Sequence, residues 1–347
     1  MRETLGKRVT QRDIARLANV SQATVSLVLN GVSDADARIP AETRKRVQDI
    51  IVSTGYIADP AARSLVKASN RILGVFTYEP AFPSGQADFF TPFLFGVEET
   101  AQDLGYDLLL LTGRATEADG RKKIFHAGSR LRMADGCLLL GVLFDQEELQ
   151  RLVESDYPFV AIGRREDASG RVPYVGADYV TATAELATRS MALGHTKMAY
   201  IGPADRAESR IDRWVGFQSA IDGRADLVCR EPASGIDPEV LLDRVLESGA
   251  TIVFFVELAD AVPFRDAVVA RGLSVPADIS IVVLGSHVRA SAKGIGFTTY
   301  AVPREEMGRQ ATDMLVGLIT GTQKPQQILL KCEQVPGETL GPARTRI

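Results

Sequence analysis

The chain has 347 residues, of which 45% are hydrophobic and 24% are charged, and its formal net charge is −4. This composition is typical of a globular protein with two or three domains and excludes an intrinsically disordered chain. No apolar run approaches the roughly 20 residues of a membrane helix, and charges occupy the N-terminal segment where a signal peptide needs its apolar core. We therefore expect a cytoplasmic protein without a membrane partner.

The charge distribution and the cysteine content indicate which partners and sites the protein has. Residues 1–68 carry eleven Lys or Arg against seven Asp or Glu, which gives this segment a net charge of +4 and leaves −8 for the rest. A small basic segment before an acidic body suggests that only the former meets a polyanion, although a solvated surface has the same charge pattern. Cys137, Cys229 and Cys332 lie far apart in sequence, which predicts buried thiols rather than disulfides or a zinc site.

Residues 10–30 predict two short helices joined by a tight turn. Thr10 is the expected N-cap of a helix over residues 11–18, Asn19 tolerates the left-handed backbone of the turn, and Ser21 caps a second helix over residues 22–30. The residues expected to face inward are Ile14, Ala15, Leu17 and Ala18 in the first helix and Val25, Val28 and Leu29 in the second. The second helix therefore presents Gln22, Ala23, Ser26 and Leu27 outward, as in a helix-turn-helix whose second helix enters the major groove.

A third helix is predicted from Ala41, with Val47, Ile50 and Ile51 closing a three-helix core before Gly55 ends it. Taken alone, these helices also fit a generic helical hairpin. Asp59 and Pro60 then form a strong start signal for a helix of about seven residues, which is marginal in water unless a partner packs against it.

The stretches TQRDIARLANVSQATVSLVLNG and IPAETRKRVQDIIVSTGYIADPAARSL, followed by GVFT, resemble the LacI/GalR family of bacterial transcription regulators. The resemblance implies that the N-terminal helices contact an operator half-site and that the short hinge helix orders only on DNA. It also implies that a leucine from each subunit, here Leu65 with Ala62 one turn earlier, opens the central base step in the minor groove.

The predicted DNA contacts follow from this arrangement. Many relatives carry an arginine where this chain has Leu27, and leucine offers only apolar contact, for example to a thymine methyl group. We expect base contacts from Gln22, Ala23 and Leu27, and contacts mostly to phosphates from Thr10, Ser21, Thr24, Ser26, Asn30 and Arg38. Tyr56, Ala62 and Leu65 complete the predicted DNA-binding set.

From Arg71 onward, strand patterns alternate with helix patterns, which predicts an α/β body of two doubly wound parallel sheets covered on both faces. The resemblance implies a two-lobed, periplasmic-binding-protein-like (type I) body with crossovers near Pro173, residues 298–301 and Pro325. The expected domains are a helix-turn-helix domain at 1–58, a hinge helix and linker at 59–69, an N-terminal lobe at 70–173 with 302–324, and a C-terminal lobe at 174–301 with 325–347.

Ligands of doubly wound sheets bind beyond the carboxyl ends of the strands, so we expect an effector in the cleft between the lobes. The resemblance implies that Arg213 contacts a sugar hydroxyl pair and that an aromatic such as Phe90 stacks on the ring. Core positions for Phe89 and Phe90, a surface ion pair for Arg213 and a structural role for His287 remain alternatives. The predicted effector-binding residues are Tyr78, Phe90, Arg164, Arg213, Glu257, Ser286 and His287.

Two departures from the family pattern bear on the effector. Glu257 and Leu258 replace a common Asn-Asp pair, and Gly285, Ser286 and His287 stand where many relatives carry Asp. These differences disfavour an unmodified hexose. Among a sugar, a sugar acid and a sugar phosphate, an acidic or phosphorylated metabolite suits Arg164, Arg213, His287 and Arg304.

Two other function classes, an enzyme and a solute-binding protein, fit the sequence less well. The sequence lacks the nucleotide-binding, nucleophile-elbow and HExxH motifs of enzymes, and His126, His195 and His287 have no partner motif. A transport-associated solute-binding protein needs an export signal and no DNA-binding segment. We therefore predict a homodimeric regulator, most consistent with a repressor, that binds double-stranded operator DNA without a cofactor or metal. Whether the effector releases or recruits DNA is open.

Overall fold

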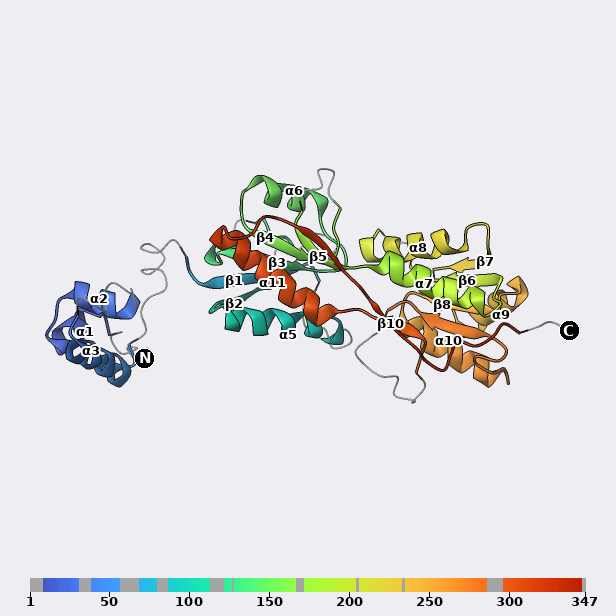
Figure 1. Cartoon of the computed structure of the whole chain (residues 1–347), viewed down its shortest axis with the longest axis horizontal. Helices are drawn as coiled ribbons and strands as arrows, with labels where there is room; N and C mark the ends of the chain where they lie inside the picture. Colours follow the sequence, from blue (N-terminus) through green and yellow to red (C-terminus); the bar gives the residue numbers. More distant parts are fainter. Residues whose placement is uncertain are drawn as a thin grey trace, which may run out of the picture. The chain divides into compact units, whose positions relative to one another are not determined.

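The computed structural model describes residues 9–30, 39–56, 69–79, 87–112, 122–126, 128–166, 172–203, 206–232, 235–285 and 296–344. The chain divides into two compact units, Met1–Asn70 and Arg71–Ile347, whose elements are labelled in Figure 1. The expected hinge helix with Ala62 and Leu65, as well as Arg38, Ser286 and His287, lies outside the described residues. Among the described residues, no helix combines the length and the apolar character needed to cross a lipid bilayer.

The first unit contains the three predicted helices, α1 (Gln11–Ala18), α2 (Gln22–Asn30) and α3 (Ala41–Thr54). Thr10 caps α1 through a capping box, in which its hydroxyl accepts from the Asp13 N–H and the Asp13 carboxylate accepts from the Thr10 N–H. Asn19 ends α1 in the left-handed region, with φ 48°, and Gly55 ends α3 in the same region, with φ 60°. These local signals fix the helix ends before any packing is considered.

The core of this unit is small, so its helices depend on few contacts. Its buried members come from all three helices and are Ile14, Ala15, Ala18, Val25 and Val47. Val28, Leu29, Ile50 and Ile51 pack against them as expected. The inward position predicted for Leu17 is wrong, because this side chain is 56% exposed at the edge of the buried face. The Nε of Arg46 on α3 donates to the Ala18 carbonyl at 3.0 Å and ties α3 to the end of α1.

In the second unit, a six-stranded parallel sheet forms the first lobe, in the order β11-β5-β4-β3-β1-β2. Its strands are β1 (Ile72–Thr77), β2 (Asp107–Leu111), β3 (Gly136–Leu140), β4 (Phe159–Ile162), β5 (Tyr174–Ala177) and β11 (Gln327–Leu330). Alternate residues of the buried strands point to opposite faces. Leu138 and Leu140 pack in the same cluster as α5 (Ala87–Asp103) and α11 (Arg304–Thr320), whereas Cys137 and Leu139 pack with α6 (Gln146–Glu154).

The second lobe repeats this plan with a four-stranded parallel sheet in the order β7-β6-β8-β9. Its strands are β6 (Lys197–Ile201), β7 (Asp226–Glu231), β8 (Ile252–Phe255) and β9 (Ser280–Val283). Its helices are α7 (Tyr179–Ala192), α8 (Glu208–Ile221), α9 (Pro238–Ser248) and α10 (Leu258–Ala270). Ile252 and Phe254 pack in the same cluster as α7 and α8, and Val253 and Phe255 pack with α9 and α10. The prediction of two doubly wound parallel sheets is thus confirmed.

Two of the predicted crossovers are wrong by one strand. We expected the chain to leave the first lobe near Pro173 and Pro325, but β5 and β11 pair with each other and extend the first sheet. The chain therefore crosses after Ala177 and after Leu330. The residues after each proline continue the first sheet because pairing with a parallel neighbour satisfies their backbone hydrogen bonds. The remaining crossover contains β10 (Thr299–Ala301), which pairs antiparallel with β12 (Glu333–Val335).

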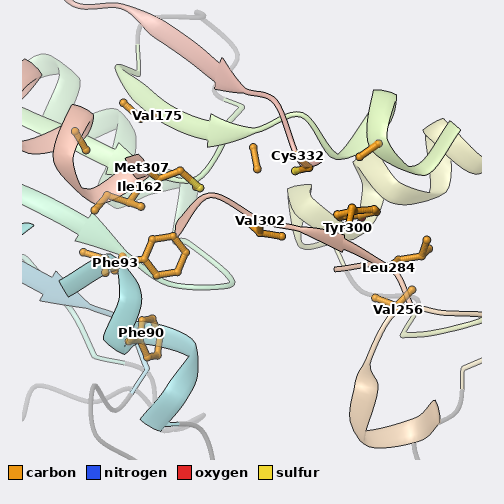
Figure 2. Close-up of a cluster of buried hydrophobic side chains, with 14 of the residues drawn as sticks. Phe90, Phe93, Ile162, Val175, Val256, Leu284, Tyr300, Val302, Met307 and Cys332 are labelled. Atoms are coloured by element: carbon orange, nitrogen blue, oxygen red, sulfur yellow. The ribbon is translucent and has the colours of Figure 1, made fainter. Parts of the chain in front are cut away.

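Buried side chains on these connections join the cores of the two lobes. Figure 2 shows Tyr300, Val302 and Cys332 on the connecting segments, with Met307 of α11 and Phe93 of α5 on the side of the first lobe. Helices α5 and α11 touch closely, since a Cβ at Gly96 would lie 2.0 Å from the Glu305 carbonyl oxygen and one at Gly308 would lie 2.2 Å from that of Phe93. Only glycine fits at these positions, and the contact fixes the start of α11 beside the start of α5.

His195 holds the C-terminal segment against the second lobe. Its ring is almost fully buried, with Nε2 3.0 Å from the Gly341 carbonyl oxygen and Nδ1 2.7 Å from the Thr251 hydroxyl. The carbonyl can only accept, so Nε2 carries the proton and Nδ1 accepts from Thr251 in the neutral ring. Burial lowers the pKa of His195 from its ordinary value of 6.5, while the hydrogen bond to Gly341 opposes the shift.

This lowered pKa predicts a pH-dependent stability. Below about pH 6.5 the unfolded chain binds a proton at His195 before the folded chain does, so the free energy of unfolding falls as the pH falls below that value. We expect His195→Gln to remove this part of the acid-side slope in urea titrations between pH 7.5 and 5. His126→Gln, which alters a partly exposed histidine of the first lobe, serves as the control and keeps the slope. An unchanged slope in His195→Gln would contradict the assignment.

Candidate nucleic-acid interface and effector cleft

The outer face of α2 carries the side chains that sequence analysis assigned to base contacts. Gln22 and Ala23 are exposed, and Leu27 is 38% exposed, although it belongs to a helix whose other leucine, Leu29, packs on the core. Helix α2 fits the major groove in width, and its exposed N-terminal side chains are those that reach base edges in a helix-turn-helix. The first unit thus leaves a mixed polar and apolar face free of internal packing.

Polar side chains beside this face are already held in place. The Nε2 of Gln22 donates to the Oε1 of Gln11 at 3.1 Å, which links the first residues of α1 and α2. The Ser21 hydroxyl accepts from the Thr24 N–H at 3.1 Å and lies 2.9 Å from the Thr24 hydroxyl. Ser21 and Thr10 therefore cap their helices. Either hydroxyl would have to contact a DNA phosphate while it still accepts the hydrogen bond of its helix cap.

The other predicted DNA-binding residues are less directly placed. Ser26 is partly buried, and Tyr56 packs against the core of the first unit just after α3. Of Asn30, only the backbone at the end of α2 is described. The structure thus brings the α2 residues and Thr10 into one unit and gives Tyr56 a packing role that the sequence did not indicate.

In the second unit, a cleft with a cavity volume of about 50 Å³ separates the two lobes. This volume is small beside the roughly 300–1,000 Å³ of typical ligand pockets. The lining comes from the carboxyl ends of β3 and β4, the start of α5, and helices α7, α8 and α11. The aromatic and charged side chains of this lining include Phe89, Phe90, Arg164, Arg165, Tyr179 and Asp212.

Arg164 forms a bidentate ion pair across the cleft. It follows β4 of the first lobe, and its Nε and Nη2 donate to the two carboxylate oxygens of Asp212 on α8 at 2.8 and 2.7 Å. Its Nη1 donates to the exposed Glu166 at 2.6 Å. Burial raises the pKa of Asp212, while the hydrogen bonds from Arg164 oppose the shift. Arg164 was predicted to bind effector, but its three donor nitrogens are occupied by carboxylates.

Arg165 forms a second link between the lobes. Its Nη1 lies 3.3 Å from a carboxylate oxygen of Glu208, one turn before Asp212 on α8, and its Nη2 donates to the Gly141 carbonyl at 2.5 Å. The guanidinium stacks 3.9 Å from the centre of the Phe144 ring. Burial lowers the pKa of Arg165, and the charge of Glu208 opposes this. Two successive arginines thus bind two carboxylates spaced four residues apart; we name these two pairs the interlobe latch.

Arg213 lies beside the cleft but donates to the protein's own backbone. Its Nε donates to the Leu284 carbonyl at 2.8 Å and its Nη1 to the Ser209 carbonyl at 2.7 Å, and the guanidinium stacks 4.0 Å from the centre of the Tyr179 ring. Its neighbour Arg210 pairs with Glu257 at 3.0 Å. Arg213 is therefore held rigidly in place, and Glu257 is engaged in an ion pair on the side of the second lobe.

The aromatic predictions have mixed outcomes. Phe90 lines the cleft and is 2% exposed, with the Phe89 ring at 5.0 Å. Both residues lie inside α5, which begins at Ala87 and continues through Pro92. Tyr78 is a buried member of the core cluster between the first sheet and α6, in contact with Phe76 and Phe144, and burial raises its pKa. The structure thus places Tyr78 away from the cleft lining.

Two sequence families match the two units. Residues 10–59 match the family described as bacterial regulatory proteins, lacI family, and residues 187–340 match a periplasmic binding protein-like domain. The chain therefore carries a LacI-family DNA-binding domain followed by a periplasmic-binding-protein-like domain. It is therefore a DNA-binding transcriptional regulator.

Relatives align over nearly the whole chain. It is 29% identical to the HTH-type transcriptional regulator CelR of Thermobifida fusca over 347 residues, which cover 94% of this chain and 96% of that protein. It is also 29% identical to the ribose operon repressor of Escherichia coli K12, covering 92% and 96%. The lac repressor dimer bound to operator and the anti-inducer ONPF shares the fold, with a TM-score of 0.77 at 20% identity, covering 96% of this chain and 100% of that one.

Sequence analysis missed both carboxylates of the latch. Glu208 and Asp212 stand four residues apart in ESRID, which places both on one face of a helix, and Arg164 and Arg165 follow a buried strand. These paired spacings were the available signal, but the sequence did not indicate that the two segments meet. Among the described residues, no group of three or more His, Cys, Asp or Glu side chains is arranged to hold a metal ion.

The latch predicts a large cost for removing one partner. Asp212→Asn leaves Arg164, whose side chain is only 16% exposed, without its bidentate acceptor, and breaking a largely buried pair in this way costs about 3 kcal/mol of unfolding free energy. The matched control is Asp243→Asn, which removes an exposed carboxylate paired with Arg271 and has a smaller effect. Urea titrations followed by circular dichroism compare the two. Equal losses for both variants would show that the latch does not hold the lobes.

Proposed function

We propose that this chain represses transcription by binding a pseudopalindromic operator as a homodimer, and that a small metabolite in the interlobe cleft controls its operator affinity. The protein acts in the cytoplasm as a regulator rather than an enzyme. The observation that carries the proposal is the outer face of α2, where Gln22, Ala23 and Leu27 are exposed on a helix-turn-helix. The match of residues 10–59 to the lacI family of bacterial regulatory proteins supports the same role.

Dimerisation follows from the small size of the DNA-binding unit. One helix-turn-helix presents too few base contacts for a specific site, so two copies on adjacent half-sites are needed. The lac repressor, which shares this fold, is described as a dimer bound to operator. We propose that Leu65 of each copy, with Ala62, enters the minor groove at the centre of the operator, as the family resemblance implies.

Metabolite control is proposed to act through the interlobe latch. The pairs Arg164–Asp212 and Arg165–Glu208 join side chains of different lobes, so they exist only in one arrangement of the lobes. A metabolite that enters the cleft has to fit around these pairs or replace them, and it thereby favours one arrangement over another. The expected coupling between metabolite and operator is about 1 to 3 kcal/mol, and it acts equally in both directions.

The base-contact assignment predicts a change of sequence preference. Leu27→Arg places a guanidinium where leucine offers only apolar contact, and a bidentate arginine contact favours guanine by about 1 to 3 kcal/mol. We expect sequences selected from a random pool by Leu27→Arg to gain a guanine at one position of each half-site. Leu17→Arg adds the same charge to an exposed position of α1 and leaves the selected sequence unchanged.

Two results would count against the proposed function. One is a wild-type half-site with a strict guanine requirement that Leu27→Ala leaves intact. The other is a wild-type protein that, at moderate salt, prefers no sequence over bulk competitor DNA. Deletion of residues 1–68 provides the control for the body, since the second unit alone should keep its fold and lose DNA binding.

A further inference from the structure

Arg304 is a buried cation that forms no ion pair with any residue that the structure describes. It is the first residue of α11 and is 7% exposed, and its Nε is buried with no hydrogen-bond partner. The contact that the structure gives its guanidinium is the Phe89 ring, whose centre is 5.6 Å away. The adjacent carboxylates Glu305 and Glu306 bind Arg309 instead. A cation at the N-terminus of a 17-residue helix also interacts unfavourably with the helix dipole. The charge of Arg304 is therefore destabilised both by burial and by the dipole of α11.

Arg213 brings a second positive charge from the other lobe. It is 8% exposed, and the acceptors of its hydrogen bonds are the neutral carbonyls of Leu284 and Ser209. The nearby Glu257 is already paired with Arg210. Within the described part of the chain, no carboxylate hydrogen-bonds to Arg213 or Arg304.

The contrast with the latch is informative. Arg165 is also buried at the cleft and Arg164 is partly buried there, yet each is paired with a carboxylate of α8. Phe89, next to Arg304, and Tyr179, stacked on Arg213, line this same cleft, so the two cations lie behind its aromatic lining on opposite lobes. Arg304 itself lines an adjoining pocket with Pro92 and Val302. Burial, and after it the positive charge of Arg213, lower the pKa of Arg304, as expected for two cations that share one region.

We propose that the cleft binds an anionic group of the effector, a carboxylate or a phosphate, between Arg213 and Arg304. This inference rests on the proposed effector control and adds the chemical class of the ligand. An anion supplies the acceptors that Arg304 lacks and is favoured by the N-terminus of α11, whereas a neutral sugar leaves this cation unpaired. Because the two arginines belong to different lobes, a bound anion also ties the lobes together.

The test uses inorganic phosphate and thermal unfolding of the full chain. Wild type, Arg304→Met and Arg265→Met are melted in phosphate and in chloride at equal ionic strength. Arg265 is the matched control, because it is buried in α10 away from the cleft lining and its Nη1 also lacks a partner. General salt effects on burial act on all three proteins alike.

We expect phosphate at about ten times its dissociation constant to raise the Tm of wild type and Arg265→Met by about 3 °C more than that of Arg304→Met. In chloride, Arg304→Met should melt at the same temperature as wild type or higher, because it removes an unpaired buried charge. Equal phosphate effects in wild type and Arg304→Met would overturn the proposal. A lower Tm of Arg304→Met in chloride would do the same, since Arg304 would then be structural.

The outcomes separate this inference from the proposed function. A neutral sugar that binds wild type and Arg304→Met equally well would overturn the anion site and leave the regulator intact. Failure of the wild-type protein to select any DNA sequence would overturn the regulator. It would not affect the phosphate measurement, because that measurement involves no DNA.

Discussion

The body of this protein depends on one electrostatic constraint, namely that a charge removed from water needs a partner of opposite charge. Arg164 and Arg165 leave the first sheet at the end of β4 and enter the space between the lobes. Glu208 and Asp212 meet them there because residues four apart lie on one face of α8. These pairs exist only in this one arrangement, since separation of the lobes would exchange both ionic contacts for hydration of the four charges.

This constraint also explains why the cleft is small. A cavity of about 50 Å³ remains because the guanidinium groups of Arg164 and Arg165 occupy the entrance that strand ends usually leave to a ligand. A ligand therefore competes with protein groups for the same donors or uses Arg213 and Arg304, which lack carboxylate partners. In either case the ligand changes the ionic interactions that join the two lobes.

The sequence predicted the features that depend on neighbouring residues and missed those that depend on distant ones. Thr10 and Asn19 predicted the ends of α1, and alternating patterns predicted both sheets, since these signals act within a few residues. The crossovers were misplaced because the pairing of β5 with β11 joins segments more than 150 residues apart. Likewise, no local pattern showed that Arg164 meets Asp212, or that Tyr78 points into a core instead of the cleft.

The DNA-binding unit depends less on buried side chains than the body does and more on the caps of its helices. Its core has few buried side chains, so helix caps and turns determine much of its fold. The hydroxyl groups of Thr10 and Ser21 provide two of these caps. The residues proposed to contact bases lie on the opposite side of α2 and contribute little to that core. Substitution at Leu27 or Gln22 therefore changes the DNA face without removing a cap or a core contact. Sequence preference in this unit is thus separable from folding.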